Sequence, residues 1–371
     1  MTEPTSVHDL ETPAALVEVD RMHANLARAA EYCRAHGLAW RPHVKTHKVP
    51  EIAAEQLRAG AVGITVATPR EAEVMASAAE DVLLAYPPFG AAKLRRLVSL
   101  PESVRLTVGL DSAEALGELA RAAREAGREV EVLVEVDLGM HRVGVQTPEE
   151  AVALARLAAD ERGLAYRGMM FYPGHIREHV DSQGPALRAL SDALGGYLEA
   201  LDRAGLPPAT VSGGSTPTFW RSHEVAGLNE VRPGTNVFND RTTALVGACA
   251  WEECAYTVLA TVVSTSVPGQ AVIDAGSKAL AREELRAEGG GFGALLDRPE
   301  VAVKAVSEEH GMLDLSRTGW RPRVGDRVRV VPNHVCVSVN LHERLLGVRG
   351  DEVVAEWQGA GRGRGPWAAA S

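Results

Sequence analysis

The 371-residue sequence contains few lysines, few cysteines and no long apolar run. Only five of its 39 basic residues are lysines, so each lysine stands out against a strong preference for arginine. The four cysteines have no CxxC spacing and do not form a disulfide framework. No apolar run approaches the roughly 20 residues that span a bilayer, and Met1–Leu10 lacks the apolar core of a signal peptide. We therefore expect a cytoplasmic protein without a membrane partner.

The formal net charge is −10, and the sequence has neither a basic stripe nor aromatic residues interleaved with basic ones. Nucleic acid is a poor partner for such a chain, because binding it requires concentrated positive charge. The composition, 46% apolar and 24% charged, is that of a globular protein. The length indicates about two domains.

Short apolar runs alternate with helical stretches rich in Ala, Leu, Arg and Glu over residues 13–245. After a first run and a first helix within residues 14–36, eight further runs follow: Leu38–Val44, Ala61–Ala67, Asp81–Tyr86, Val104–Leu110, Glu129–Val136, Leu164–Tyr172, Ala209–Ser212 and Leu228–Arg232. Eight strand–helix pairs predict an α/β fold, a (β/α)8 barrel. A doubly wound sheet is the alternative, but no GxGxxG follows the first strand.

The pattern changes after about residue 245. Several β-branched runs are separated by Gly, Pro and acidic turns: Tyr256–Val267, Ala271–Asp274, Val301–Val306, Arg327–Val337 and Asp351–Glu356. The expected helix in this part is Ala279–Glu288. The pattern predicts a smaller β domain over residues 246–371, on which residues 1–12 are expected to pack.

Two glycine loops follow the last two strands of the predicted barrel. Gly213, Gly214 and Ser215 come directly after the seventh strand, and Gly234 with Thr235 follows the eighth. Free backbone N–H groups and hydroxyls form a phosphate cradle, and these loops are the usual phosphate site of a (β/α)8 barrel. The alternative is an ordinary glycine turn followed by a Ser/Thr helix cap.

Lys45 lies at the end of the first barrel strand, between His43 and His47. If the strand continues, these three side chains share one face. A lysine can form a Schiff base, which arginine cannot, and a lysine paired with a phosphate cradle is what pyridoxal phosphate requires. An exposed strand-end lysine is the alternative.

His334 and Cys336 are two residues apart in the strand-like run Val328–Val339. Residues at this spacing face the same side of a strand, so the imidazole and the thiolate can hold one metal ion, most naturally Zn²⁺. Two protein ligands leave open positions, which suits catalysis. The alternative is a core histidine beside an inert cysteine. We interpret Cys249 and Cys254 as structural.

Seven segments resemble motifs of the D-threonine aldolase and D-serine dehydratase family of fold-type III pyridoxal phosphate enzymes. They occur in family order over nearly the whole chain, and such enzymes have an alanine-racemase-type barrel followed by a β domain. The segments are Pro42–Lys48, Met140–Gly144, Ser212–Thr216, Arg232–Gly234, Asp274–Leu280, Ser307–Gly311 and Pro332–Cys336.

This resemblance implies a role for each candidate residue. Lys45 becomes the Schiff-base lysine and the catalytic residue. Arg142 and Tyr172 contact the cofactor ring and its substituents, and the two glycine loops hold the phosphate. His334 and Cys336 become the ligands of a divalent metal, with Zn²⁺ favoured over Mn²⁺ or Mg²⁺. The resemblance also implies a homodimer.

The expected activity is that of a lyase on small β-hydroxy-D-amino acids. Cys336 favours a D-serine or 3-hydroxy-D-amino acid dehydratase, because aldolases of the family often carry a carboxylate there. The alternative is retro-aldol cleavage to glycine and an aldehyde, with His175 or His179 as candidate base. An amino-acid racemase and a non-catalytic pyridoxal phosphate carrier are further alternatives.

Overall fold

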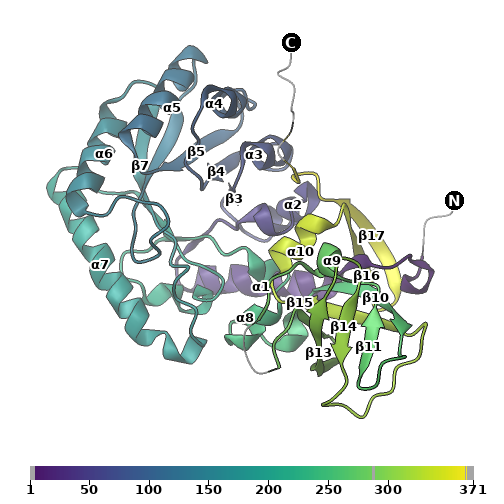
Figure 1. Cartoon of the computed structure of the whole chain (residues 1–371). Coiled ribbons are helices and arrows are strands. Elements are labelled where there is room, and N and C mark those ends of the chain that lie inside the picture. Colours follow the sequence, from purple (N-terminus) through teal and green to yellow (C-terminus); the bar gives the residue numbers. More distant parts are fainter. Residues whose placement is uncertain (1–4, 286–288, 364, 366–371) are drawn as a thin grey trace. The chain divides into compact units, whose positions relative to one another are not determined.

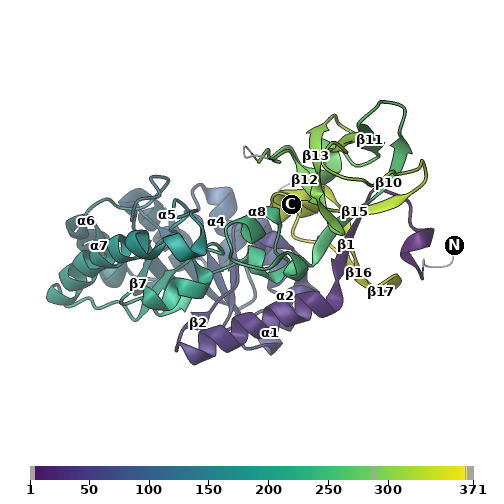
Figure 2. The same cartoon turned by 90° about the horizontal axis from the view of Figure 1, so that it is seen from below.

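The computed structural model describes residues 5–285, 289–363 and 365, which form two compact units (Figures 1 and 2). The barrel unit contains Arg28–Gly234 and the described residues from Ala360 onward. The β unit contains the described residues up to Ala27 together with Thr235–Gly359. This division follows spatial contacts, and the domain limits 13–245 and 246–371 stay a prediction. Met1–Pro4, within the segment expected to pack on the β domain, lie outside the described residues.

The barrel unit contains eight parallel strands, as the eight apolar runs predicted. Their order in the sheet is β2-β9-β8-β7-β6-β5-β4-β3. The strands are β2 (Ala39–Trp40), β3 (Ile64–Val66), β4 (Asp81–Leu84), β5 (Arg105–Leu110), β6 (Val130–Glu135), β7 (Leu164–Met170), β8 (Thr210–Gly213) and β9 (Glu230–Val231). The segment after β2 also pairs with β3, because the Val62 and Thr65 N–H groups donate to the carbonyls of Trp40 and Pro42 at 2.9 and 2.8 Å. The two ends of the sheet therefore meet, and the (β/α)8 prediction is confirmed.

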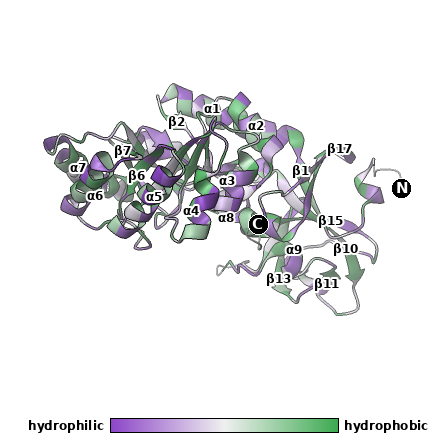
Figure 3. Cartoon of the chain, turned by 90° about the horizontal axis from the view of Figure 1, so that it is seen from above, coloured by the Kyte–Doolittle hydropathy of each residue, from purple (hydrophilic) through white to green (hydrophobic). Residues whose placement is uncertain are grey.

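Helices fill the gaps between these strands and lie on the outer face of the sheet (Figure 1). They are α2 (Pro50–Arg58), α3 (Pro69–Met75), α4 (Ala91–Val98), α5 (Ala113–Glu125), α6 (Pro148–Asp160) and α7 (Gly184–Arg203). Thr68, Ser112 and Thr147 cap α3, α5 and α6 by accepting backbone N–H groups. Hydrophilic and hydrophobic residues alternate along α5 and α6, which matches helices with one buried and one solvated side (Figure 3).

The β unit is built on a nine-stranded sheet of order β11-β14-β13-β12-β15-β10-β1-β16-β17. The strands are β1 (Ala14–Glu18), β10 (Tyr256–Ser264), β11 (Gln270–Ile273), β12 (Gly293–Leu295), β13 (Arg298–Val306), β14 (Gly311–Asp314), β15 (Arg327–Pro332), β16 (Arg344–Arg349) and β17 (Glu352–Gln358). Since β10 pairs with β11 as well as with β15, six of these strands form a closed ring. A β domain was predicted, but β12, β14 and β16 were not among the expected strands.

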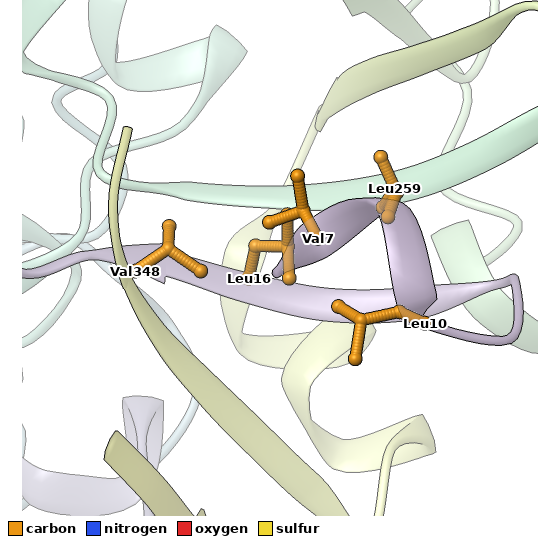
Figure 4. Packing of buried hydrophobic residues seen from close by; sticks show 5 residues of the cluster. All are labelled: Val7, Leu10, Leu16, Leu259 and Val348. Atoms are coloured by element: carbon orange, nitrogen blue, oxygen red, sulfur yellow. The ribbon is translucent and has the colours of Figure 1, made fainter. Parts of the chain in front are cut away.

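An apolar cluster joins the N-terminal segment to this sheet. Val7, Leu10, Leu16, Leu259 and Val348 are each at most 6% exposed and pack together (Figure 4). The Val7 N–H also donates to the Asp351 carbonyl at 2.9 Å. The described residues before β1 are thus part of the β unit.

The helices associated with the β unit differ from expectation. They are α8 (Arg241–Leu245), α9 (Ser277–Leu280), α10 (Val335–Leu341) and the first part of α1 (Val19–Ala35). The expected helix Ala279–Glu288 is replaced by the shorter α9, and Arg286–Glu288 lie outside the described residues. The expected strand Val328–Val339 is wrong beyond Pro332, because α10 follows β15. Within the described ranges, no helix combines the length and apolarity needed to cross a bilayer.

Candidate active site

Lys45 lies on a short 3-10 helix, Val44–Thr46, just after β2. The strand does not continue, so the prediction that His43, Lys45 and His47 alternate on one strand face is wrong. His43 caps the turn, and its Nδ1 accepts the Lys45 N–H at 3.5 Å. His47 instead lies in the core, with Nε2 3.2 Å from Gln56 Oε1. Only His43 remains associated with Lys45, which is itself half-buried.

Positive charge surrounds His43. Burial lowers the pKa of this imidazole well below its usual range, and the charges of Lys45, Arg232 and Arg142 lower it further. An electrostatic effect of this kind requires proximity. The structure therefore brings Lys45 and Arg142, both predicted site residues, to the same end of the barrel.

Arg142 lies in a loop after β6 that is held by two carboxylates. Asp137 accepts the N–H groups of Gly139 and His141, each at 3.0 Å, and Asp111 accepts the Gly144 N–H at 2.8 Å. The Arg142 guanidinium lies over the ring of Tyr172, 5.0 Å from its centroid. These two predicted site residues are therefore adjacent.

The predicted phosphate loops follow β8 and β9. Gly214 has a φ of +82°, a backbone conformation that favours glycine. The Ser215 N–H donates to Thr218 Oγ1 at 3.2 Å, and the Gly234 N–H to Thr216 Oγ1 at 3.3 Å. The two loops are therefore rich in hydroxyl and N–H groups, which are the donors that bind an anion.

Gly234 lies directly against the turn that carries Lys45. A Cβ built on Gly234 would stand 2.7 Å from the His43 carbonyl oxygen and 3.0 Å from Thr46 Oγ1. No real side chain fits at such distances. The loop after β9 and the lysine turn are thus packed together, as the sequence-based site requires.

A buried ionic network below this loop was not identified from the sequence. Arg232 donates to Ser212 Oγ at 2.5 Å and to the Phe171 carbonyl at 2.8 Å. The Ser212 hydroxyl donates to Glu230, which also accepts from Arg41 at 2.8 Å. The signal that was available is a charged side chain inside an apolar strand, since Glu230 and Arg232 flank Val231.

In the β unit, His334 and Cys336 lie at the start of α10. His334 is the N-cap residue of this helix and Cys336 is its second residue, so the same-face strand argument is wrong although the two side chains do contact each other. Cys336 Sγ also lies 3.8 Å from Thr235 Oγ1. Thr235 therefore belongs with this pair in the β unit.

Asp240 orients the pair and was not identified from the sequence. Its Oδ2 lies 3.2 Å from His334 Nδ1 and accepts the Val335 N–H at 3.0 Å. Burial lowers the pKa of His334, but hydrogen bonds to Asp240 and Cys336 outweigh it and raise the pKa to about 11. With Nδ1 directed to Asp240, Nε2 is left as the ligating nitrogen. In the part of the chain that the structure describes, no third His, Cys, Asp or Glu joins these residues as a metal-ligand cluster.

Two family models match the chain. The N-terminal domain of alanine racemase matches residues 17–242, and the putative serine dehydratase domain matches residues 255–348. Together the two models cover most of the chain.

Individual relatives match over almost the full length. D-threo-3-hydroxyaspartate dehydratase of Delftia sp. (strain HT23) is 34% identical, with 94% of this chain and 97% of the relative covered. The crystal structure of D-threonine aldolase from Filomicrobium marinum is 31% identical with a TM-score of 0.90, covering 98% of each chain. A cysteine-to-alanine variant of D-threo-3-hydroxyaspartate dehydratase, solved in its metal-free form, is 31% identical with a TM-score of 0.84 and covers 96% and 99%.

Proposed function

Because the chain belongs to the D-threonine aldolase and D-serine dehydratase family of pyridoxal phosphate-dependent lyases, we propose that it is a metal-dependent dehydratase. Its substrates are small β-hydroxy-D-amino acids of the D-serine and 3-hydroxy-D-aspartate type, and its products are a keto acid and ammonia. The observation that carries the proposal is the His334–Cys336 pair oriented by Asp240.

The residues of the barrel unit fit pyridoxal phosphate. Lys45 offers an amine close to two arginines, and Gly213, Gly214, Ser215 and Gly234 form the anion cradle. Arg142 and Tyr172 form a flat cationic and aromatic pair suited to an aromatic ring with anionic substituents. The bound cofactor would withdraw electrons from Cα of the amino acid attached to it.

Lys45 has two tasks in this reaction. It would hold the cofactor covalently, and its Nζ, when not engaged with the cofactor, would accept the Cα proton of the substrate. The β-hydroxyl must then leave.

A metal held by His334 and Cys336 is the group proposed to help the hydroxyl leave. An imidazole and a thiolate suit Zn²⁺ best, with Mn²⁺ or Mg²⁺ as less suitable ions, and two ligands leave positions open for a substrate oxygen. The metal would act as a Lewis acid. The metal-free cysteine-to-alanine variant of the related dehydratase supports Cys336 as the ligand.

Aldolase chemistry is the second candidate, and one observation bears on it. The His175 ring lies beside the loop of Arg142, 3.1 Å from the position of a Cβ built on Gly139, and is exposed. His179 caps a 3-10 helix by accepting the Asp181 N–H at 3.4 Å. His175 is therefore the better placed of the two candidates for the base of retro-aldol cleavage.

A product assay separates these functions. The enzyme is incubated with D-serine, D-threonine and 3-hydroxy-D-aspartate, with and without a chelator. We expect keto acid and ammonia in equal amounts, and loss of both with the chelator. Glycine and an aldehyde as sole products would establish the aldolase, chelator-independent inversion a racemase, and a bound cofactor without turnover a carrier.

A further inference from the structure

Glu135 is a buried carboxyl at the end of β6 that the proposed reaction does not use. It is 3% exposed, and its Oε2 is fully buried without a hydrogen-bond partner among the described residues. Leaving a carboxyl oxygen in this state costs roughly 1–3 kcal/mol. Such a group is retained only where something offsets its cost, which makes it a candidate for a role in the site.

Glu135 lines a small cavity together with Arg142 and Tyr172. The Arg142 guanidinium packs on the Tyr172 ring, but within the described residues no carboxylate lies within ion-pair distance of it. The cavity therefore contains an arginine without a counter-charge and a carboxyl without a donor.

The other charged groups around Glu135 do not pair with it. Burial raises the pKa of Glu135 and the charge of Asp111 adds to this, whereas Arg232 and Arg142 act in the opposite direction. Arg232 already donates to Ser212 and to the Phe171 carbonyl. The Asp111 carboxylate already accepts the Gly144 N–H. Arg142 is thus the cation that remains available to Glu135.

The backbone of the loop between them is fixed. The Asp137 N–H donates to the Val145 carbonyl, and the Val145 N–H donates to the Glu135 carbonyl, both at 3.0 Å. Val145 therefore closes the loop that carries Arg142 against the end of β6, with Glu135 accepting one of the two bonds. Because the backbone is held, the direction of the guanidinium depends on the side chains that face it.

We propose that Glu135 is a positioning residue, whose carboxylate orients the Arg142 guanidinium toward the cofactor that Lys45 holds. The proposal rests on the proposed function, since it requires that the barrel unit bind pyridoxal phosphate. Glu135 itself does not touch the reacting atoms. Its removal should change how tightly Arg142 holds the cofactor and how the bound cofactor titrates.

The test uses the full-length holoenzyme and the Glu135→Gln variant. The dissociation constant for pyridoxal phosphate and the pH midpoint of the absorption band of the bound cofactor are measured. We expect roughly tenfold weaker binding, as for the loss of a hydrogen bond to a charged group, and a shifted midpoint. Glu135→Asp, which keeps the charge, should recover part of both.

Two further variants make the test specific. Glu131→Gln is the matched control, because Glu131 lies on the same strand but is already paired with Arg167 and Thr107. It should leave both readouts unchanged. Glu135→Gln should have no further effect once Arg142 is changed to Gln, because the two residues act together.

Several results would overturn the proposal. One is a Glu135→Gln variant with wild-type affinity and pH midpoint, and another is additive effects with Arg142→Gln. If Glu135→Gln does not fold, a Glu135→Asp variant identical to wild type in both readouts and additive with Arg142→Gln decides against it. A wild-type chain that binds no pyridoxal phosphate would remove the proposed function itself, an outcome distinct from these.

Discussion

At the scale of single residues, Lys45 is the position where arginine, the basic residue that this chain prefers, cannot do the chemistry. Arginine replaces lysine almost throughout, but a guanidinium cannot form the covalent link to the cofactor. Lys45→Arg should keep the charge and lose the cofactor absorption band, with activity reduced at least about a thousandfold. Spectra and initial rates measure both.

The matched control for this prediction is Lys93→Arg. Lys93 lies over the Tyr86 ring, 5.5 Å from its centroid, a contact that arginine makes equally well. This variant should keep the wild-type band and rate. A cofactor band that survives in Lys45→Arg would show that another lysine forms the link.

Asp240 carries a second prediction at this scale. Its carboxylate fixes the His334 ring, and a carboxylate that orients a metal-binding histidine in this way contributes about 10–100-fold to metal affinity. Asp240→Asn keeps the helix cap on α8 but should weaken metal binding by that factor, as measured by competition with a chromogenic chelator. Asp314→Asn, at a carboxylate that caps the Ser316 N–H elsewhere in the β unit, should not change it.

At the scale of elements, the strands of the barrel were predictable and the start of α10 was not. Buried parallel strands are read directly from apolar runs. Val335, Val337 and Val339 favour a strand by the same rule, yet they form a helix because Asp240 accepts the Val335 N–H. A partner 95 residues away cannot be seen from local sequence, and this is also why Asp240 was missed.

The loop after β9 and the turn that carries Lys45 both require a residue without a side chain at position 234. Gly234→Ala would place a Cβ against the His43 carbonyl and Thr46, so the turn carrying Lys45 must move. We expect a loss of about 1–3 kcal/mol in unfolding free energy and weaker cofactor binding, measured by denaturation and titration. Gly117→Ala, in an exposed part of α5 with open space around it, should be neutral or stabilising by up to about 1 kcal/mol.

His47, in the turn that precedes α2, makes the free energy of unfolding depend on pH. Burial lowers the pKa of His47 to about 4, against 6.5 in an unfolded chain, although Gln56 and the Val49 N–H counteract this. The unfolded state therefore binds the proton first as pH falls. Stability from the neutral ring is complete above about pH 6.5, declines below it, and is about 2 kcal/mol lower at pH 5.

Urea denaturation at pH 7 and pH 5 checks this prediction. His47→Gln should be less stable at pH 7 because its hydrogen bonds change, but its loss between pH 7 and pH 5 should be smaller by about 2 kcal/mol. If His47→Gln and the wild type lose the same stability between pH 7 and pH 5, His47 is not the group responsible for the pH dependence.

At the scale of the whole molecule, the candidate residues divide between the two units. Lys45, Arg142 and Tyr172 belong to the barrel unit, whereas His334 and Cys336 belong to the β unit. Motif order along the sequence was sufficient to select these residues. It did not show Glu135 or the buried ionic network of Arg232, because both depend on which charges face each other inside the closed barrel.

This division predicts that cofactor and metal are lost independently. The candidate metal ligands and the lysine turn belong to different units, so removing the metal should abolish lyase activity while the cofactor absorption band and the far-UV circular dichroism stay unchanged. Adding Zn²⁺ back should restore the rate. Conversely, Lys45→Arg should lose the band and keep its metal. Loss of the band on chelation would contradict this independence, and full lyase activity in the presence of the chelator would argue against a role for the metal.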